Sequence, residues 1–248
     1  MGSISKYPMV KKLYKMILDK LQSPIFVTGI ERSGSSIVAR IIKSCGVFTG
    51  EVTEMQENKK IKSYVDDFYT KQIGIPANGQ FPLPDFKSTP IPIDWKYDVE
   101  NFLMKDGYIA DKSWMYKSSR IAQIWHIWNH FYPNAKWLIV RRRTGDITYS
   151  CLKTAYMSAF ANEANRRAVN ANTEQEGWLW WVHEHEKLFV EMIEAGLNVK
   201  VIWPERMAGG DFTQIAEMLE WLGLQWHDGI VDSVVPLLKN STQKERSV

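Results

Sequence analysis

A short apolar run that leads through a glycine- and serine-rich loop into a helical pattern most constrains how this chain can fold. The run is Pro24 to Thr28, the loop spans residues 29–36 with the sequence GIERSGSS, and the helix is predicted over Ser36 to Ser44. Gly29 and Gly34 have the G-x-x-x-x-G spacing of a P-loop, in which backbone N–H groups at a helix N-terminus surround an anion. A plain turn is the alternative, but the flanking strand and helix favour an anion site.

The side chains inside this loop decide which phosphate chemistry it suits. A Walker A motif needs lysine at position 35, where this chain has Ser35, so no lysine is placed to reach the β- and γ-phosphates of ATP. Arg32 supplies a cation instead, and hydroxyl donors come from Ser33, Ser35 and Ser36. The loop therefore predicts an anion site that differs from that of the ATPases.

Strand-like and helix-like stretches alternate along the rest of the chain. Further strands are predicted at Trp114 to Lys117, Lys136 to Arg141 and Val199 to Trp203. Helices are predicted at Gln56 to Gln72, Ile121 to Phe131, Thr144 to Ala159 with Thr144 as N-cap, Glu174 to Glu194 and Phe212 to Leu222. This alternation predicts one α/β domain over residues 1–248, a three-layer P-loop fold with a central parallel sheet flanked by helices.

Two segments lie outside this alternation. Residues 74–94 carry five prolines and read as a long loop, a class of segment that often forms a lid or faces a substrate. Residues 1–22 have apolar positions at helical spacing between lysines, which predicts a helix packed on its own domain, with a membrane-surface helix as the alternative.

Composition excludes several classes of protein. The 248 residues have 45% hydrophobic content and a formal net charge of +3, which argues against disorder and against a nucleic-acid polymer as partner. No apolar run is long enough to span a membrane, so stable insertion is not expected. Only two cysteines, Cys45 and Cys151, favour a reducing compartment and a cytoplasmic protein.

A second anion motif follows the strand predicted at 136–141. The strand runs into Arg141, Arg142 and Arg143, which are expected to face one phosphorylated ligand at the strand end. Ser150 lies eight residues beyond Arg142, about two helical turns past the strand end. An arginine at the strand end and a serine on the inner face of the helix can hold one phosphate together. Asp146, in the first helical turn, suits the helix dipole and can orient an arginine.

The two motifs in this order resemble those of the P-loop sulfotransferases. That family has a loop of Lys or Arg, Ser, Gly and two hydroxyl residues, matched by Arg32 to Ser36, and a later Arg, Asp and Ser, matched by Arg142, Asp146 and Ser150. Arg32, where the cytosolic branch has lysine, resembles the bacterial and carbohydrate-directed branches. The stretch VKVIWPERM and the helix ending in Leu-Gly-Leu are similar to the family's late strand and helix.

The resemblance implies a sulfotransferase that moves a sulfuryl group from 3′-phosphoadenosine-5′-phosphosulfate (PAPS) to a hydroxyl or amine. It implies that the first loop, Arg32, Ser33, Gly34, Ser35 and Ser36, holds the 5′-phosphosulfate, and that Arg142 and Ser150 hold the 3′-phosphate. Adenosine 3′,5′-bisphosphate would be the product, no metal would be needed, and the acceptor would be a small molecule or a glycan.

The acceptor side is less specified by the sequence. Glu54 is the first candidate for general base, followed by Glu57 and then Glu51, because trehalose-type sulfotransferases place a base glutamate shortly after a Gly-Glu pair. Lys117 resembles a lysine that some branches place beside the transferred group. For each of these residues, an ordinary solvated role is the alternative.

Two other functions stay open at this point. One is a metal-dependent P-loop kinase acting on a nucleotide or a small molecule, which the missing loop lysine disfavours. The other is a non-catalytic nucleotide-binding protein of the same fold. The 11 tryptophans suggest sugar stacking, but Trp125, Trp128, Trp178 and Trp181 have a helical spacing that favours core packing.

Overall fold

A parallel sheet forms the middle of the molecule. In this computed structural model, which describes residues 24–76, 78–80, 89–110, 112–232 and 234, the strands are β1 (Ile25–Gly29), β2 (Met115–Lys117), β3 (Lys136–Val140) and β4 (Asn198–Ile202). They lie in the order β2-β1-β3-β4, and every pairing is parallel. The predicted sheet is therefore confirmed, including its four strand segments to within about one residue at each end.

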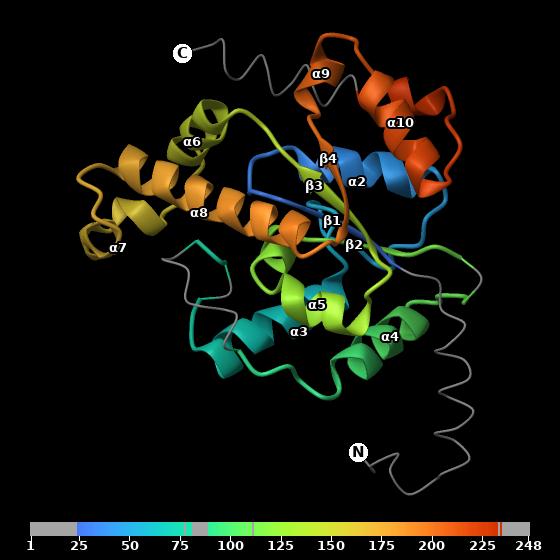
Figure 1. The fold of residues 1–248 in the computed structure, drawn as a ribbon, viewed down its shortest axis with the longest axis horizontal. Helices are drawn as coiled ribbons and strands as arrows, with labels where there is room; N and C mark the ends of the chain where they lie inside the picture. The colour runs from blue at the N-terminus through green and yellow to red at the C-terminus, as the bar shows by residue number, and fades with distance from the viewer. Residues whose placement is uncertain (1–23, 77, 81–88, 111, 233, 235–248) are drawn as a thin grey trace, which may run out of the picture.

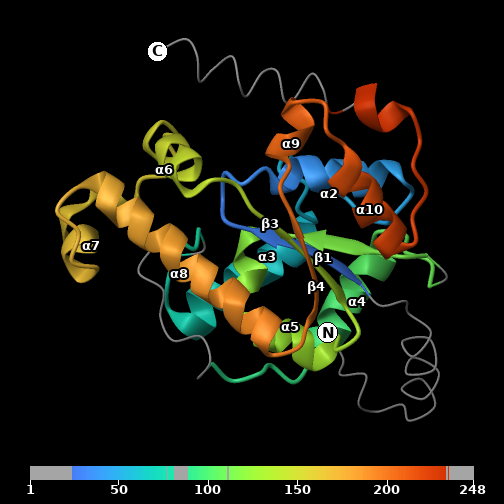
Figure 2. The ribbon, with the colours of Figure 1, turned by 45° about the horizontal axis from the view of Figure 1, so that its top comes forward.

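Helices cover both faces of this sheet. They are α2 (Ser35–Ser44), α3 (Lys59–Phe68), α4 (Trp95–Lys105), α5 (Trp125–Phe131), α6 (Thr144–Leu152), α7 (Glu163–Ala168), α8 (Glu174–Glu194), α9 (Glu205–Ala208) and α10 (Thr213–Leu222). Figure 1 shows α2, α9 and α10 above the sheet and α3, α4 and α5 below it, and the turned view in Figure 2 keeps α2 and α9 above the strands and α4 and α5 below them. The three-layer α/β architecture is confirmed.

The side chains of the strands explain the two outer layers. Successive residues of a strand point to opposite faces, so Phe26 and Trp137 enter one hydrophobic cluster while Val27 and Leu138 enter the other. The first cluster is rich in aromatic rings; the second is almost entirely aliphatic and packs on α2 and α10. Burial on both faces is what allows an all-parallel sheet to be stable.

Tryptophans fill much of the aromatic cluster. Six of them have less than 2% of their surface exposed: Trp95, Trp114, Trp128, Trp137, Trp178 and Trp181. Trp128 packs edge-on against both Phe26, at 5.0 Å between ring centroids, and Trp95, at 5.1 Å. The prediction of core packing is confirmed for Trp128, Trp178 and Trp181, and Trp125 is partly buried against the same cluster.

Several predicted helix boundaries are wrong. Thr144 is the first helical residue and Arg143 is the N-cap, without a side-chain bond to the helix. The same helix ends at Leu152 rather than Ala159, because the chain turns after Cys151 and buries Met157 and Phe160 in the core.

Other helices are divided or shifted. The segment predicted at 121–131 has a 3₁₀ turn at Ser119–Ala122 before α5. The segment predicted at 56–72 begins at Lys59, where the Asn58 side chain accepts the N–H of Ile61 at 2.9 Å, and ends in a π turn at Tyr69–Ile73. Helix α4 was not predicted. The helix predicted over residues 1–22 lies outside the described residues, as do 77 and 81–88 of the predicted 74–94 loop.

Candidate active site

A pocket of about 500 Å³ opens at the carboxyl ends of the strands. Its lining comes from the loop after β1 and the start of α2, the segment just before α3, the end of β2, and the segments after β3, α6 and β4. The residues are Glu31, Arg32, Ser33, Gly34, Ser35, Ser36, Ile37, Met55, Glu57, Lys117, Ser119, Arg142, Tyr156, Pro204, Glu205 and Ala208. In the strand order β2-β1-β3-β4, the connection from β1 leads to β2 on one side of β1, and the next connection leads to β3 on its other side. The pocket therefore lies at the topological switch point of the sheet, where the strand order reverses. Open α/β sheets bind ligands at such points.

The loop after β1 has an unusual backbone and a buried hydroxyl that faces the pocket. Arg32 has a φ of 70°, in the left-handed region that non-glycine residues rarely adopt and that is enriched at functional sites. Gly34 has a φ of 91° and lies so close to Pro204 that an added Cβ would be 2.9 Å from its Cγ. The hydroxyl of Ser33 is buried, lines the pocket and has no hydrogen-bond partner. A buried donor of this kind is suited to an anion in the pocket.

The two sequence motifs meet in space. Arg32 donates from Nε to the Ser150 hydroxyl at 2.9 Å, across 118 residues of sequence. Arg142 lines the pocket, and its Nε lies 3.9 Å from a carboxylate oxygen of Asp146. The loop therefore lies beside the inner face of α6. We call Arg32, Ser33, Gly34, Ser35, Ser36 and Arg142 the loop site.

The other two arginines after β3 do not line this pocket. Arg141 pairs with Glu186 on α8, and its guanidinium lies 5.1 Å from the centre of the Trp203 ring. Arg143 has an 80% exposed side chain near Glu205. The expectation that all three arginines face one ligand is therefore wrong. Consecutive residues of an extended segment point to different sides, and only Arg142 points to the pocket.

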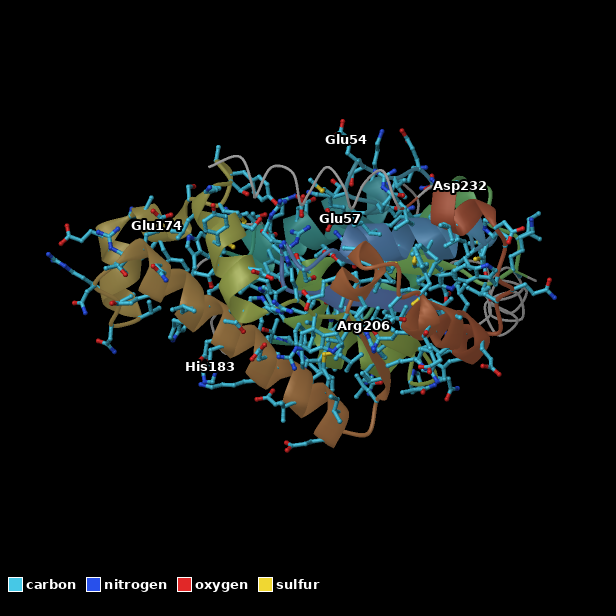
Figure 3. All side chains as sticks on the ribbon, turned by 90° about the horizontal axis from the view of Figure 1, so that it is seen from above. Glu54, Glu57, Glu174, His183, Arg206 and Asp232 are labelled. Carbon is cyan, nitrogen blue, oxygen red and sulfur yellow. The ribbon has the colours of Figure 1, made fainter. Side chains whose placement is uncertain are left out.

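The three base candidates occupy different positions. Glu51 is exposed and pairs with Lys59. Glu54 is exposed as well, and Figure 3 places it at the outer edge of the molecule, whereas Glu57 lies closer to the middle. Of the three, Glu57 alone lines the pocket.

Lys117, at the end of β2, also lines the pocket and is 7% exposed. Burial lowers the pKa of its ammonium group, while the charges of Glu57 and Glu31 oppose this shift. Glu31 is partly buried, and burial together with the neighbouring Glu57 carboxylate raises its pKa. We call Glu31, Glu57 and Lys117 the charge cluster.

Glu31 is a pocket residue that the sequence motifs do not identify. Its side chain accepts hydrogen bonds from the Ser119 hydroxyl at 3.4 Å and from the Gln80 amide at 3.5 Å. The signal in the sequence is an acidic residue inside a loop predicted to bind an anion, a place where a free carboxylate would repel the ligand. Such a residue calls for a compensating cation, but the sequence does not say which one.

Gln80 joins the charge cluster to the segment predicted as a lid. It is buried, and its amide oxygen accepts the N–H of Ser158 at 3.3 Å. The neighbouring Gly79 carbonyl accepts from Gln123 and from the Trp181 indole, each at 3.2 Å. Residues 79 and 80 are thus fixed against the core, and the lid role predicted for 74–94 stays a prediction.

The histidines lie elsewhere. His185 is buried, and its Nε2 lies 3.0 Å from the Gln123 amide that donates to the Gly79 carbonyl. His183 is exposed on the same helix, as Figure 3 shows. In the part of the chain that the structure describes, no three His, Cys, Asp or Glu side chains are grouped to hold a metal ion. Among the same residues, no helix has both the length and the apolar character needed to cross a membrane.

The fold has relatives among solved structures. The sulfotransferase STF9 from Mycobacterium avium matches 92% of this chain and 71% of its own, with a TM-score of 0.59 and 10% identity. The sulfotransferase domain of the olefin synthase from Synechococcus PCC 7002 matches 85% of this chain and 76% of its own, with a TM-score of 0.51 and 12% identity. No protein-family model and no curated protein sequence matches the chain. The chain has the fold of bacterial sulfotransferases, as the two motifs predict.

Proposed function

We propose that this protein is a sulfotransferase that takes the sulfuryl group from PAPS and passes it to a hydroxyl or amine of an acceptor. The observation that carries the proposal is the hydrogen bond between Arg32 and Ser150, because it unites the two motifs beside one pocket. The pocket lies where this fold class binds nucleotides, and the fold is that of bacterial sulfotransferases.

The loop site suits a doubly phosphorylated nucleotide. Ser33 offers a buried, unpartnered hydroxyl, and the N-terminus of α2 offers backbone N–H groups to a 5′-phosphosulfate. Arg142 and Ser150 would hold a 3′-phosphate, with Asp146 orienting the arginine. Arginine fits phosphate oxygens as a fork of donors that stays charged at any physiological pH.

Catalysis would be mostly positioning and charge stabilisation. The bond between the sulfur and the bridging oxygen of the 5′-phosphate breaks while a bond forms from the acceptor oxygen or nitrogen to the sulfur. Arg32 and the loop N–H groups stabilise the negative charge that grows on the bridging oxygen, and Lys117 neutralises charge on the sulfuryl oxygens. The acceptor's proton passes to Glu57, which lines the pocket where Glu54 and Glu51 do not.

The acceptor would be a small polar molecule or a glycan. Glu57, Lys117 and Ser119 present a carboxylate, an ammonium and a hydroxyl to the pocket, and such a lining favours a hydroxylated ligand. A screen of sugars and small hydroxylated metabolites with ³⁵S-labelled PAPS would identify it.

Calorimetry tests the donor half of the proposal. Adenosine 3′,5′-bisphosphate should bind without Mg²⁺ and more tightly than AMP, which lacks the 3′-phosphate. Binding of Mg·ATP that is tighter than binding of the bisphosphate would overturn the proposal in favour of a kinase. Tight binding of the bisphosphate with no labelled product from any acceptor would leave a nucleotide-binding protein without transferase activity.

A further inference from the structure

Glu31 lines the pocket, but the sulfuryl transfer described above gives it no role. It lies two residues after the end of β1, next to Arg32 in the sequence, and shares the pocket lining with Lys117 at the end of the adjacent strand. The two strand ends are tied together, because Ser118 donates its N–H to the Val27 carbonyl at 3.0 Å and Thr28 donates its hydroxyl to the Ser119 carbonyl at 3.3 Å. The Glu31 carboxylate and the Lys117 ammonium therefore belong to one rigid corner of the sheet.

The carboxylate of Glu31 is held from two sides. Ser119, just past β2, donates to Oε1, and Gln80 donates to Oε2. Gln80 is itself 1% exposed and is anchored by the Ser158 N–H. A carboxylate fixed by donors from two separate segments keeps its place when a ligand enters or leaves.

A buried ammonium needs such a partner. Removing a charge from water is costly unless an opposite charge and hydrogen bonds replace the lost hydration. The charged groups that act on Lys117 are Glu57, Glu31 and Arg120. Arg120 is a like charge, and it pairs with Asp66 of α3, so only the two carboxylates favour the charged lysine.

The proposed reaction neutralises the negative charge of one of these two carboxylates. When Glu57 takes the acceptor's proton, its negative charge is lost at the moment when the transferring group most needs the ammonium. The loss also relieves the repulsion that Glu57 exerts on Glu31, so Glu31 holds its own negative charge more firmly.

We propose, on the premise of the sulfotransferase function, that Glu31 is a positioning residue whose fixed carboxylate keeps the Lys117 ammonium charged through the proton transfer to Glu57. Glu31 acts through Lys117 and does not contact the transferred group. Its negative charge thereby offsets the positive charge of Lys117 in the part of the pocket where PAPS and the acceptor would meet.

Competitive labelling of lysines with acetic anhydride, read by mass spectrometry over a pH series, measures the titration of Lys117 without PAPS or an acceptor. In Glu31→Gln, the midpoint of Lys117 titration should fall by about 1 pH unit, as expected for the loss of one nearby charge. Glu31→Asp, which keeps the charge, should restore most of the shift. Glu205→Gln, which removes a carboxylate from the β4 side of the same pocket, should leave the midpoint unchanged.

An unchanged or raised midpoint in Glu31→Gln overturns the proposal. If that variant does not fold, Ser119→Ala serves instead: the Glu31 carboxylate then loses one of the two donors that fix its position, so the Lys117 midpoint should fall by a smaller amount, and no fall overturns the proposal. Once an acceptor is known, the basic limb of the kcat/KM pH profile should move with the labelling midpoint. A shifted midpoint without sulfuryl transfer would reject the proposed function but not the electrostatic effect of Glu31 on Lys117.

Discussion

The two sides of the pocket, the loop site and the charge cluster, are built on different principles. The loop site uses backbone N–H groups, hydroxyls and arginines, whose charge or polarity does not depend on pH in the physiological range. The charge cluster uses two carboxylates and a lysine, and burial pushes Glu31 and Lys117 towards their neutral forms. One side is therefore suited to holding a constant anion, and the other to a group whose charge changes during a reaction.

The largest effect is expected in the charge cluster. Glu57→Gln should leave bisphosphate affinity intact and lower turnover roughly 100- to 10,000-fold, because an amide cannot take the acceptor's proton. Steady-state kinetics with labelled PAPS, together with calorimetry, would separate the two quantities.

Glu54→Gln is the matched comparison, since it makes the same change three residues away, outside the pocket lining. If Glu54→Gln loses the turnover and Glu57→Gln does not, the base is the exposed residue and the division of the pocket into two sides is wrong.

The next largest effect belongs to the loop site. Arg142→Ala should weaken adenosine 3′,5′-bisphosphate binding by about 1.5–3 kcal/mol, the range for a hydrogen bond to a charged group. AMP binding should hardly change, because AMP lacks the 3′-phosphate. Calorimetry with both nucleotides measures this difference directly.

Arg143→Ala controls for net charge, because its exposed side chain carries the same charge from the adjacent position. Equal losses for the two nucleotides in Arg142→Ala, or equal losses in both variants, would contradict a specific 3′-phosphate role.

The sequence predicted the loop site far better than the charge cluster, and the reason is physical. A strand, a turn and a helix N-terminus are local structures, and the spacing from Arg142 to Ser150 is fixed by a single helix, so both motifs are visible in the chain. The four strands and most helices were found for the same reason, since each depends on its own apolar pattern.

The charge cluster combines residues from three distant segments. Whether Glu31 points to the pocket depends on the left-handed backbone at Arg32, and its partners Ser119 and Gln80 follow from the packing of β2 and of the segment near Gly79. The choice among Glu51, Glu54 and Glu57 likewise depends on the turn before α3, where the chain bends at Gln56 with a φ of 65°. No local sequence pattern predicts which of these side chains point to the pocket.

The folded protein should lose stability in acid because of His185, a buried histidine on α8. Burial lowers the pKa of His185 to about 4 from its ordinary value of 6.5. As the pH falls below 6.5, the unfolded chain binds a proton that the folded chain does not bind until about pH 4, so the folded state loses stability. Between about pH 7 and pH 5 the loss from this residue should be about 2 kcal/mol.

Urea unfolding of the wild type at several pH values measures this loss. His185→Gln should flatten the dependence, since glutamine does not titrate, while His183→Gln on the exposed face of α8 should not. An unchanged pH dependence in His185→Gln would mean that His185 is protonated at no cost in the folded state.

The smallest effect tests whether the backbone conformation of the loop at Gly34 contributes to bisphosphate binding. Gly34→Ala and Gly46→Ala both place a Cβ at a positive φ, and each should lose about 1–2 kcal/mol of unfolding free energy. Only at Gly34 does the new Cβ also meet Pro204, whereas Gly46 has nothing within 4 Å. Gly34→Ala should therefore move the loop N–H groups and weaken bisphosphate binding by about 1 kcal/mol, roughly fivefold, while Gly46→Ala should bind normally. Equal affinities in the two variants would show that the cradle tolerates a shift against Pro204. Anion binding would then rest on Arg32 and Arg142 rather than on backbone geometry.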